Sequence, residues 1–438
     1  MMWELLAHEG IAVETTCRQW TYSELREAIL ERSNKWREQV SSGQTIRISD
    51  KNVLEQIISI FACVDLGLIP SLSGSSEVSA DFESFENDLR KTTEQGYRFH
   101  TEVGMIFTTS GTMSSRRIVG HRLSALMQCA QDMNQVLNMN PETRTALILP
   151  LSFHYGFSMV TSTFRMGGTV LIPNDYENMF ELPQFFESKQ PTMIGTVPHC
   201  WMVLLRMLSP DVWNRIQTCI LAGDECHVGL MQQLSQHNID MDIHIFYGCT
   251  EVLRTCHRRW QSADPQGLIG DVLPSVHLEW TMDGVVQTGT TLCHEIVEGG
   301  RTTHISPSSW VLSDELRLDT AGLWHFVGRS SEVIKIAGIR YSPTEIEDSI
   351  LQHPDVVDIV VGMMNDAITA IVQIKPGILR HEEIVLPSRL IPRYWIVIDE
   401  PFATTERFKR SRKRILQNVS QHHTRTTEPP EFLVIRKS

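Results

Sequence analysis

The chain has 438 residues, with 39 Lys plus Arg against 52 Asp plus Glu, which gives a net charge of −13. This acidic balance disfavours nucleic acid as a partner, because binding its phosphate backbone needs an excess of cations. Hydrophobic residues make up 42% and charged residues 21%, as in a globular protein. No stretch approaches the roughly 20 apolar residues that a membrane-spanning helix needs. We therefore expect no membrane span and no nucleic-acid partner.

The cysteines and the N-terminus narrow the class further. The nine cysteines are odd in number and scattered, and no C-x-x-C occurs, which argues against a disulfide framework or a structural zinc site. The first residues lack the basic start and the long apolar run of a secretory signal, so we expect a cytoplasmic location. The length predicts two or three folding units.

Helical and strand-like patterns alternate in the first hundred residues. Tyr22–Gln39 has apolar residues at helical spacing, with Thr21 or Ser23 as its N-cap. A strand-like Thr45–Ser49 follows, and Val53–Leu66 is a second amphipathic helix. Such alternation predicts an α/β layer structure.

Five short apolar runs in the middle of the chain are bounded by Pro or Gly and separated by helical stretches. This is the pattern of buried strands in a sheet rich in βα units. The runs are Ala146–Pro150, Gly168–Pro173, Thr192–Thr196, Gln217–Ala222 and His244–Tyr247.

Strand-like patterns dominate after about Gly267, with a hairpin turn at Met282–Gly284. A short α+β unit then follows, and its elements are a helix at Thr344–Leu351 and strands at Val356–Gly362, Ala367–Ile374 and Tyr394–Ile398. We predict an N-terminal domain over 1–330, a C-terminal domain over 331–416, and a tail over 417–438 that is either disordered or docked as a strand.

Three segments carry residues suited to nucleotide chemistry. In Met105–Arg117, a strand-like entry leads into hydroxyls around one Gly and ends in two arginines. Hydroxyls and free backbone N–H groups can surround phosphate oxygens while arginine supplies charge. The alternative is a solvated Ser/Thr-rich turn. The segment is not a Walker A loop, because it lacks Gly-x-x-x-x-Gly-Lys-Ser/Thr.

The second segment, Phe246–Glu251, offers a Gly for close approach of a ligand, an aromatic ring for a purine and a carboxylate for Mg²⁺. A buried Tyr and a helix N-terminal Glu are the alternative interpretation. The third segment consists of Ser313–Arg317 and Gly322–Gly338. Its Asp314 and Arg329, on neighbouring strands, could hold two ribose hydroxyls. Their alternatives are a turn residue and a surface cation.

In this order, the three segments resemble the acyl-adenylate-forming superfamily of acyl-CoA synthetases, aryl-acid ligases, luciferases and the adenylation domains of peptide synthetases. A weaker likeness, as at Trp20–Leu25 and Leu149–His154, extends it over nearly the whole chain. The stretches that stand at family motifs are Thr109–Thr112, Tyr247–Glu251, Ser313–Asp314, Gly328–Arg329, Ile334–Gly338 and Tyr341–Glu347.

The resemblance implies a large N-terminal α/β domain of layered sheets and helices, a small mobile C-terminal α+β lid, and an active site between them. In such enzymes, a carboxylate attacks the α-phosphate of ATP to give an acyl-adenylate and pyrophosphate. A pantetheine thiol then takes the acyl group. ATP and Mg²⁺ are therefore the implied cofactors, and a carboxylic acid is the implied substrate.

The resemblance also implies residue roles. The residues that would surround the β- and γ-phosphates are Thr109, Ser110, Gly111 and Thr112. Tyr247, followed by Gly248, would stack on adenine beside Gly223, Asp224 and Glu225. Thr250 would contact the α-phosphate, Glu251 would bind Mg²⁺, and Asp314 with Arg329 would hold the ribose.

Several positions depart from the family pattern. Ser114 or Ser115 stands near the second loop glycine and Arg117 at the loop lysine, which keeps the charge but changes its geometry. The hinge, usually Asp, is Ser331. The late catalytic lysine is either Lys409 or, with a different gap, a cation at Arg407. We favour Lys409, because the spacing of Lys409, Arg412 and Ile415 matches the family's K-x-x-R-x-x-L.

The segment Phe153–Phe157 limits which acid can be the substrate, because it contains no carboxylate to bind an α-ammonium group. An α-amino acid is therefore disfavoured. His154 either orders the substrate's carboxylate or phenolic group, or is a satisfied core histidine. An apolar pocket for an aryl or short acyl group is expected from residues that could equally be core, namely Phe153, Tyr155, Phe157, Val197, Leu221 and Cys249.

The thiol acceptor is suggested by a basic run in which six of eight residues are cations: Arg407, Lys409, Arg410, Arg412, Lys413 and Arg414. Such a patch would attract an acidic acyl carrier protein or the 3′-phosphate of coenzyme A, or it is a solvated helix face. We slightly favour a carrier protein, since the compact chain resembles dedicated carrier-loading ligases. Two alternatives stay open: an acyl-CoA synthetase, and a non-catalytic nucleotide-binding relative.

Overall fold

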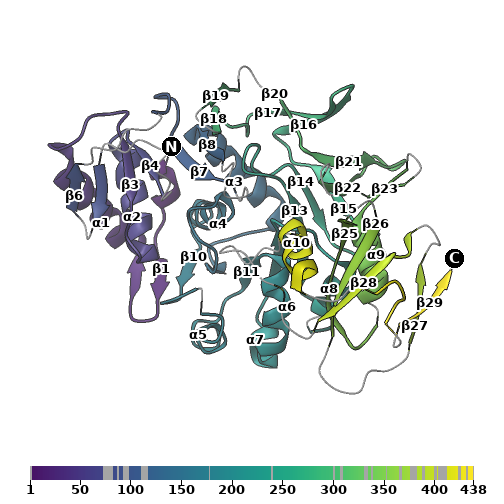
Figure 1. Ribbon diagram of the computed structural model, residues 1–438. Coiled ribbons are helices and arrows are strands. Elements are labelled where there is room, and N and C mark those ends of the chain that lie inside the picture. Colours follow the sequence, from purple (N-terminus) through teal and green to yellow (C-terminus); the bar gives the residue numbers. More distant parts are fainter. Residues whose placement is uncertain are drawn as a thin grey trace.

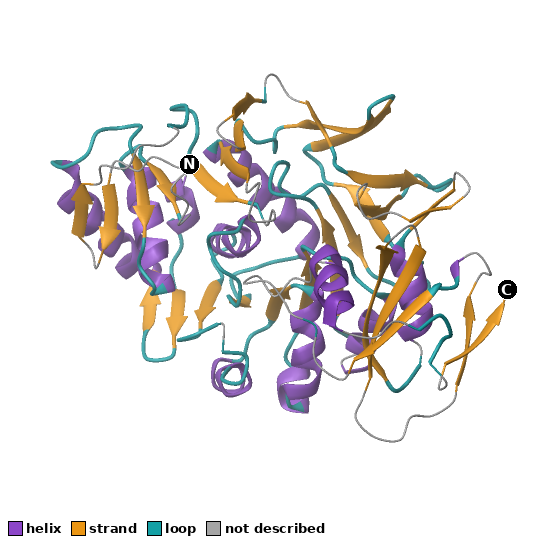
Figure 2. Cartoon of the chain, viewed as in Figure 1, coloured by secondary structure: helices purple, strands orange, loops and turns teal. Residues whose placement is uncertain are grey.

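A computed structural model of the chain contains a large N-terminal part of layered sheets and helices and a smaller C-terminal part with its own sheet (Figures 1 and 2). The structure describes residues 2–437 except 73–81, 86–87, 92–97, 110–116, 177, 238–239, 299–300, 306–308, 330–333, 337–338, 352, 365–366, 375–381, 387–389, 399–401, 403–411, 423–425 and 431–432. Within these ranges, every helix is too short or too polar to traverse a lipid bilayer.

Eleven strands of the described residues form the largest sheet. In spatial order they are β2 (Gln19–Thr21), β1 (Ile11–Thr15), β10 (Thr169–Ile172), β9 (Arg144–Ala146), β11 (Met193–Thr196), β12 (Thr218–Ala222), β13 (Asp242–Tyr247), β14 (Cys256–Arg259), β15 (Leu268–Val272), β22 (Trp324–Arg329) and β21 (Asp314–Leu318). The neighbours from β1 to β13 are parallel, and those from β13 to β21 are antiparallel. Since parallel strands end at one edge, the segments that follow β12 and β13 begin side by side.

A second sheet of eight described strands mixes parallel and antiparallel neighbours. In spatial order they are β19 (Arg301–His304), β18 (Glu295–Glu298), β8 (Arg117–His121), β7 (Met105–Thr108), β4 (Ile69–Ser71), β3 (Thr45–Ile48), β5 (Phe82–Phe85) and β6 (Asp88–Lys91). A third, small sheet contains β16 (Val276–Thr281), β17 (Gly284–Gly289) and β20 (Ser309–Val311). The hairpin between β16 and β17 confirms the predicted turn at Met282–Gly284.

Helices separate and cover these sheets. The helices on one face of the largest sheet, between it and the second sheet, are α1 (Tyr22–Arg37), α2 (Val53–Asp65), α3 (Leu123–Leu137) and α4 (His154–Arg165). Those on the other face are α5 (Leu182–Lys189), α6 (Pro198–Met207), α7 (Pro210–Trp213) and α8 (Val228–His237). Side chains of β12 alternate between the two cores: Ile220 packs in the first, and Cys219 and Leu221 pack in the second. A short 3₁₀ helix, Met2–Leu6, precedes them.

The first long helix begins where the sequence predicts. Of the two possible N-caps, Thr21 is the one in the structure: its side chain accepts from the Glu24 amide, and the Glu24 carboxylate accepts from the Thr21 amide. This reciprocal pair satisfies two of the N–H groups that a helix start leaves open. Ser23 lies inside the helix instead.

The C-terminal part has a three-stranded sheet with a helix on each face. The sheet consists of β25 (Val356–Met364), β26 (Ala367–Ile374) and β28 (Tyr394–Ile398), and the helices are α9 (Pro343–Leu351) and α10 (Arg412–His422). Ile359 packs toward α9 and Val360 toward α10, as the alternation of a strand requires. The predicted α/β layers and the smaller α+β unit are thus confirmed.

Two further pairs of strands belong to this part: β23 (Ile334–Ile336) with β24 (Ile339–Tyr341), and β27 (Glu382–Leu386) with β29 (Leu433–Lys437). The pair of β27 and β29 is parallel. Of the two possibilities for the tail, a docked strand is therefore the one in the structure.

All nine cysteines are free thiols. Cys17 is exposed, in the turn between β1 and β2, and the other eight are buried or half-buried.

Candidate active site

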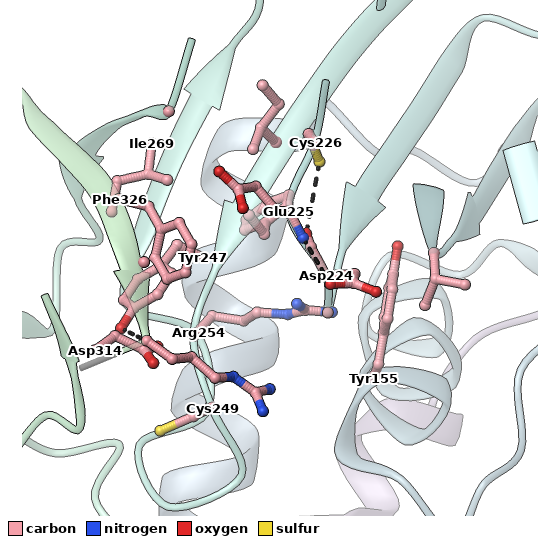
Figure 3. A pocket seen from close by; sticks show the side chains of 18 of the residues that line it. Tyr155, Asp224, Glu225, Cys226, Tyr247, Cys249, Arg254, Ile269, Asp314 and Phe326 are labelled. Atoms are coloured by element: carbon pink, nitrogen blue, oxygen red, sulfur yellow. Dashed lines mark hydrogen bonds between the residues drawn. The ribbon is translucent and has the colours of Figure 1, made fainter. Parts of the chain in front are cut away.

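A cavity of 660 Å³ lies where the segments after β12 and β13 meet β21, β22 and the C-terminal part. Figure 3 shows part of its wall. Sixteen of the predicted site residues line it: Thr109, Arg117, Phe153, His154, Tyr155, Val197, Gly223, Asp224, Glu225, Tyr247, Gly248, Cys249, Thr250, Glu251, Asp314 and Arg329. Ser110, Gly111, Thr112, Ser331 and Lys409 lie outside the described residues. The three segments singled out from the sequence therefore meet at one cavity.

Thr109 and Arg117 lie side by side where β7 and β8 meet the segment that connects them. The Thr109 amide donates to the Arg117 carbonyl at 2.9 Å, and the Arg117 amide donates to Thr109 Oγ1 at 3.2 Å. The guanidinium of Arg117 reaches Glu251 Oε1 at 3.1 Å and Glu298 Oε2 at 2.9 Å. Although burial lowers the pKa of Arg117, the hydrogen bonds to Glu298 and Glu251 leave it raised overall.

The turn after β13 is fixed by contacts on both sides. The Tyr247 hydroxyl donates to Asp314 Oδ2 at 2.9 Å, as Figure 3 shows. Burial, followed by the nearby Asp314 charge, raises the pKa of Tyr247. His121 Nε2 lies 2.7 Å from the Thr250 carbonyl, and burial lowers the pKa of His121 to about 4. A neutral imidazole that donates to this carbonyl ties the turn to the second sheet.

Asp314 and Arg329 are direct partners in the register of β21 and β22. The expectation that they stand on neighbouring strands is therefore correct, and both line the cavity. A carboxylate and a guanidinium at one strand pair can accept from one hydroxyl and donate to another.

Glu225 lines the cavity, but its carboxylate is directed at the C-terminal part. It accepts a hydrogen bond from the Thr344 hydroxyl and lies 3.4 Å from Ser342 Oγ, at the start of α9. Burial raises its pKa to about 7. Two residues along, His227 Nδ1 contacts Asp348 of α9. The Glu225 side chain therefore joins the two parts of the chain.

Five of the residues expected around the acid line the cavity: Phe153, His154, Tyr155, Val197 and Cys249. Phe153 is the N-cap of α4, and His154 is its first residue. Burial, followed by the nearby Arg254 charge, lowers the pKa of His154 well below its usual value, so this imidazole is neutral. Phe157 and Leu221 are core residues away from the cavity, at 2% and 0% exposure. The position of Phe157 on α4 directs its side chain into the core on one face of the sheet, and the position of Leu221 on β12 directs its side chain into the core on the other face.

Sequence reasoning missed several cavity residues. The missed residues discussed below are Met231, Arg254, Trp260, Glu347 and Arg412. Arg412, counted in the basic run, is directed inward: its guanidinium pairs with Glu347 and donates to the Val361 carbonyl at 2.7 Å. It is therefore a structural cation and not part of a surface patch.

Carboxylate oxygens suited to Mg²⁺ come from Glu251 and Glu298, which both contact Arg117. The Arg117 guanidinium lies between these two carboxylates. The electrostatic potential of Glu251 and Glu298 therefore favours a cation at this position. This donor chemistry fits a hard divalent ion beside the phosphate-side segment.

A second group of donor atoms lies elsewhere in the described part of the chain. His100, Glu102 and His294 bring one ligand atom each within 4.8 Å of one another. The Glu102 carboxylate is already paired with Arg122 Nε at 2.8 Å, so this group competes poorly for a metal ion.

Comparison with known proteins agrees with this geometry. The family model "AMP-binding enzyme" matches residues 73–281, a range that includes Thr109, Arg117 and the turn after β13. Residues 73–281 therefore carry the AMP-binding domain of the acyl-adenylate-forming superfamily.

Individual relatives are distant. Acyl-coenzyme A synthetase ACSM2 of Rattus norvegicus is 27% identical over 123 residues, 24% of this chain and 22% of the relative. Gramicidin S synthase 2 of Aneurinibacillus migulanus is 20% identical over 334 residues, 68% of this chain and 8% of the relative. The chain thus spans less than a quarter of the length of either relative.

Among solved structures, O-succinylbenzoate coenzyme A synthetase (MenE) from Bacillus subtilis, in complex with ATP and a magnesium ion, is similar with a TM-score of 0.76. The two chains are 18% identical over 95% of this chain and 98% of that one. The chain therefore shares the fold of that enzyme over 95% of its length.

Proposed function

We propose that this chain is an ATP-dependent acid–thiol ligase that works through an acyl-adenylate. The observation that carries the proposal is the convergence of Thr109 and Arg117, the turn after β13, and the pair Asp314 and Arg329 on one cavity. ATP requires hydroxyls and a cation for its phosphates, an aromatic ring for its purine, and a hydrogen-bonding pair for its ribose. The similar fold of an enzyme solved with ATP and magnesium supports the assignment.

The proposed reaction has two steps. The carboxylate of an acid attacks the α-phosphate of ATP, and pyrophosphate leaves. A thiolate then attacks the acyl carbon, a thioester forms, and AMP leaves. Thr109, with Ser110, Gly111 and Thr112, binds the β- and γ-phosphates, and Thr250 contacts the α-phosphate. The Arg117 side chain turns away from Glu251 and Glu298, and its guanidinium then stabilises the charge of the leaving pyrophosphate.

Mg²⁺ bound by Glu251 would neutralise phosphate charge. Lys409 is the proposed cation at the α-phosphate during the first step, and Ser331 is the proposed hinge of a lid over 331–416. Tyr247 and Gly248 face adenine together with Gly223 and Asp224.

The proposed acid is an aryl or short acyl acid, held near His154. For the acceptor we propose the phosphopantetheine thiol of an acyl carrier protein, with free coenzyme A as the alternative. Five cations of the basic run would steer an acidic partner once Arg412 is excluded: Arg407, Lys409, Arg410, Lys413 and Arg414. A cytoplasmic location belongs to the same proposal.

Exchange of labelled pyrophosphate into ATP tests the first step. The exchange should depend on an added acid, and Arg117→Met should lower it by about 10²- to 10³-fold. Lys409→Ala should lower the exchange but spare thioester formation from a preformed adenylate. ATP binding without exchange across aryl and acyl acids would favour the non-catalytic relative instead. Parallel thioester assays with a carrier protein and with coenzyme A decide the acceptor.

A further inference from the structure

Arg254 is a buried cation on the wall of the cavity. The residue is 4% exposed, and its guanidinium carbon lies 4.2 Å from the ring centroid of Tyr155 and 5.5 Å from that of Phe246. In Figure 3 the side chain extends across the view toward Tyr155. Aromatic faces attract a guanidinium, but they leave its N–H edge available for hydrogen bonds.

That edge has no anion among the described residues. Nε and Nη2 of Arg254 are buried and lack a hydrogen-bond partner there, and the guanidinium forms no ion pair with a described carboxylate. Burial lowers the pKa of Arg254, yet an arginine keeps its charge in proteins. A buried charge without a partner is strongly disfavoured. An anion placed against this edge would therefore be stabilised.

The turn after β13 directs Glu251 and Arg254 to different partners. Glu251 is directed at Arg117, whereas Leu253, with a φ of 62°, is left-handed and redirects the chain just before Arg254. The close turn depends on Gly248, where a Cβ would lie 1.9 Å from the Leu253 carbonyl oxygen. Arg117 therefore pairs with carboxylates, whereas Arg254 lies against aromatic rings of the same cavity.

The surroundings of Arg254 fit the tail of an organic acid better than a nucleotide phosphate. The Tyr155 hydroxyl is already used, since it donates to the Ile220 carbonyl at 3.1 Å. Burial, followed by the Arg254 charge, lowers the pKa of His154, so this residue supplies no second cation. Met231 and Trp260 add apolar surface to the cavity. A single buried guanidinium beside aromatic rings is suited to one planar carboxylate.

We propose that Arg254 binds a second carboxylate of the substrate, so that the preferred acids are dicarboxylic. This inference rests on the proposed ligase function: one carboxylate reacts at the nucleotide, and the other pairs with Arg254. A charged hydrogen-bonded pair of this kind is worth about tenfold to a hundredfold in affinity.

Binding tests the inference without catalysis. The probes are aliphatic diacids of three to six carbons and the three benzenedicarboxylic acids, each compared with its monomethyl ester. At least one diacid should bind the wild-type chain, measured by calorimetry, at least about tenfold more tightly than its ester. Arg254→Met should bring that ratio to about one. Arg259→Met, which removes an exposed cation paired with Asp242, is the matched control and should keep the ratio.

Pyrophosphate exchange separates the two hypotheses. Exchange with monocarboxylates but not with diacids would support the ligase and overturn the role of Arg254. Diacid binding that depends on Arg254, without exchange, would support this role and count against the ligase. Equal loss of diacid and ester binding in Arg254→Met would also overturn it, because Arg254 would then serve the reacting carboxylate or the fold. Arg254→Lys, which keeps the charge without the planar fork, gives the same comparison if Arg254→Met does not fold.

Discussion

Replacing Glu225 by Gln should remove a pH dependence from the contact between the N-terminal part and α9. In the structure, the Glu225 carboxylate is buried against Thr344, and burial raises its pKa from 4.5 to about 7. His227 and Arg412 act in the opposite direction, and Glu347 raises the pKa further. The docked arrangement therefore favours the protonated carboxyl group.

The sign and the size of the effect follow from this shift. A group with a raised pKa in the docked state stabilises that state fully below pH 4.5, and this stabilisation is lost as the pH rises through 7. With these two pKa values, the ratio of docked to undocked chains should fall about tenfold between about pH 6 and about pH 8, which is about 1.4 kcal/mol. Glu225→Gln keeps an acceptor for Thr344 but carries no charge.

Hydrogen exchange of the α9 amides, corrected for the intrinsic rate at each pH, measures this docking. Protection in the wild-type chain should fall about tenfold from about pH 6 to about pH 8, and protection in Glu225→Gln should change much less. His227 is present in both proteins, so the difference between them isolates Glu225. Asp224→Asn changes the adjacent carboxylate and should retain the wild-type pH dependence. Equal pH dependence in Glu225→Gln and the wild type would refute the reasoning.

Three other substitutions give measurable effects. Arg412→Met should destabilise the C-terminal part by about 3–5 kcal/mol in urea unfolding, because the buried Glu347 carboxylate loses its cation. Thr21→Ala should cost about 1 kcal/mol in the same assay, since the capping box of α1 is lost. Gly248→Ala should reduce the stabilisation of the chain by added AMP in thermal unfolding, because its Cβ would collide with the Leu253 carbonyl and displace the turn.

Matched variants accompany these measurements. Gly229, inside α8, has open space where a Cβ would lie, so Gly229→Ala should leave AMP stabilisation unchanged and raise stability by about 0.4–1 kcal/mol. Wild-type stability in Arg412→Met would show that Glu347 finds another partner. An unchanged AMP response in Gly248→Ala would show that the turn moves without consequence for the nucleotide.

Local signals made much of the fold predictable. The Thr21 cap and the apolar periodicity after it give α1 nearly to its ends, and the five apolar runs correspond to β9–β13. The run at Ala146–Pro150 is the least well placed: its strand ends at Ala146. The adjacency of Asp314 and Arg329 was also predictable, because short strands joined by a turn pair in register.

The remaining features of the site depend on contacts between residues far apart in the sequence. Glu225 and Thr344 are 119 positions apart, and no periodicity links them. Arg254 follows Leu253, which has a left-handed backbone conformation. The presence of a leucine in the sequence does not predict this conformation. Phe157 and Leu221 are apolar, as residues of a pocket for an aryl group would be, but they are buried in the cores on the two faces of the sheet. The motifs thus located the cavity, whereas the orientation of single side chains within it depended on tertiary contacts.

The free cysteines give this cavity built-in chemical reporters. Cys226 and Cys249 are on its wall, and burial raises the pKa of both thiols, so alkylating reagents should modify them slowly. Exposed Cys17 should react first and at a rate that no occupant of the cavity changes. Mass spectrometric footprinting with iodoacetamide can therefore rank unlabelled small molecules by the shielding of two cysteines, with a third as the internal standard.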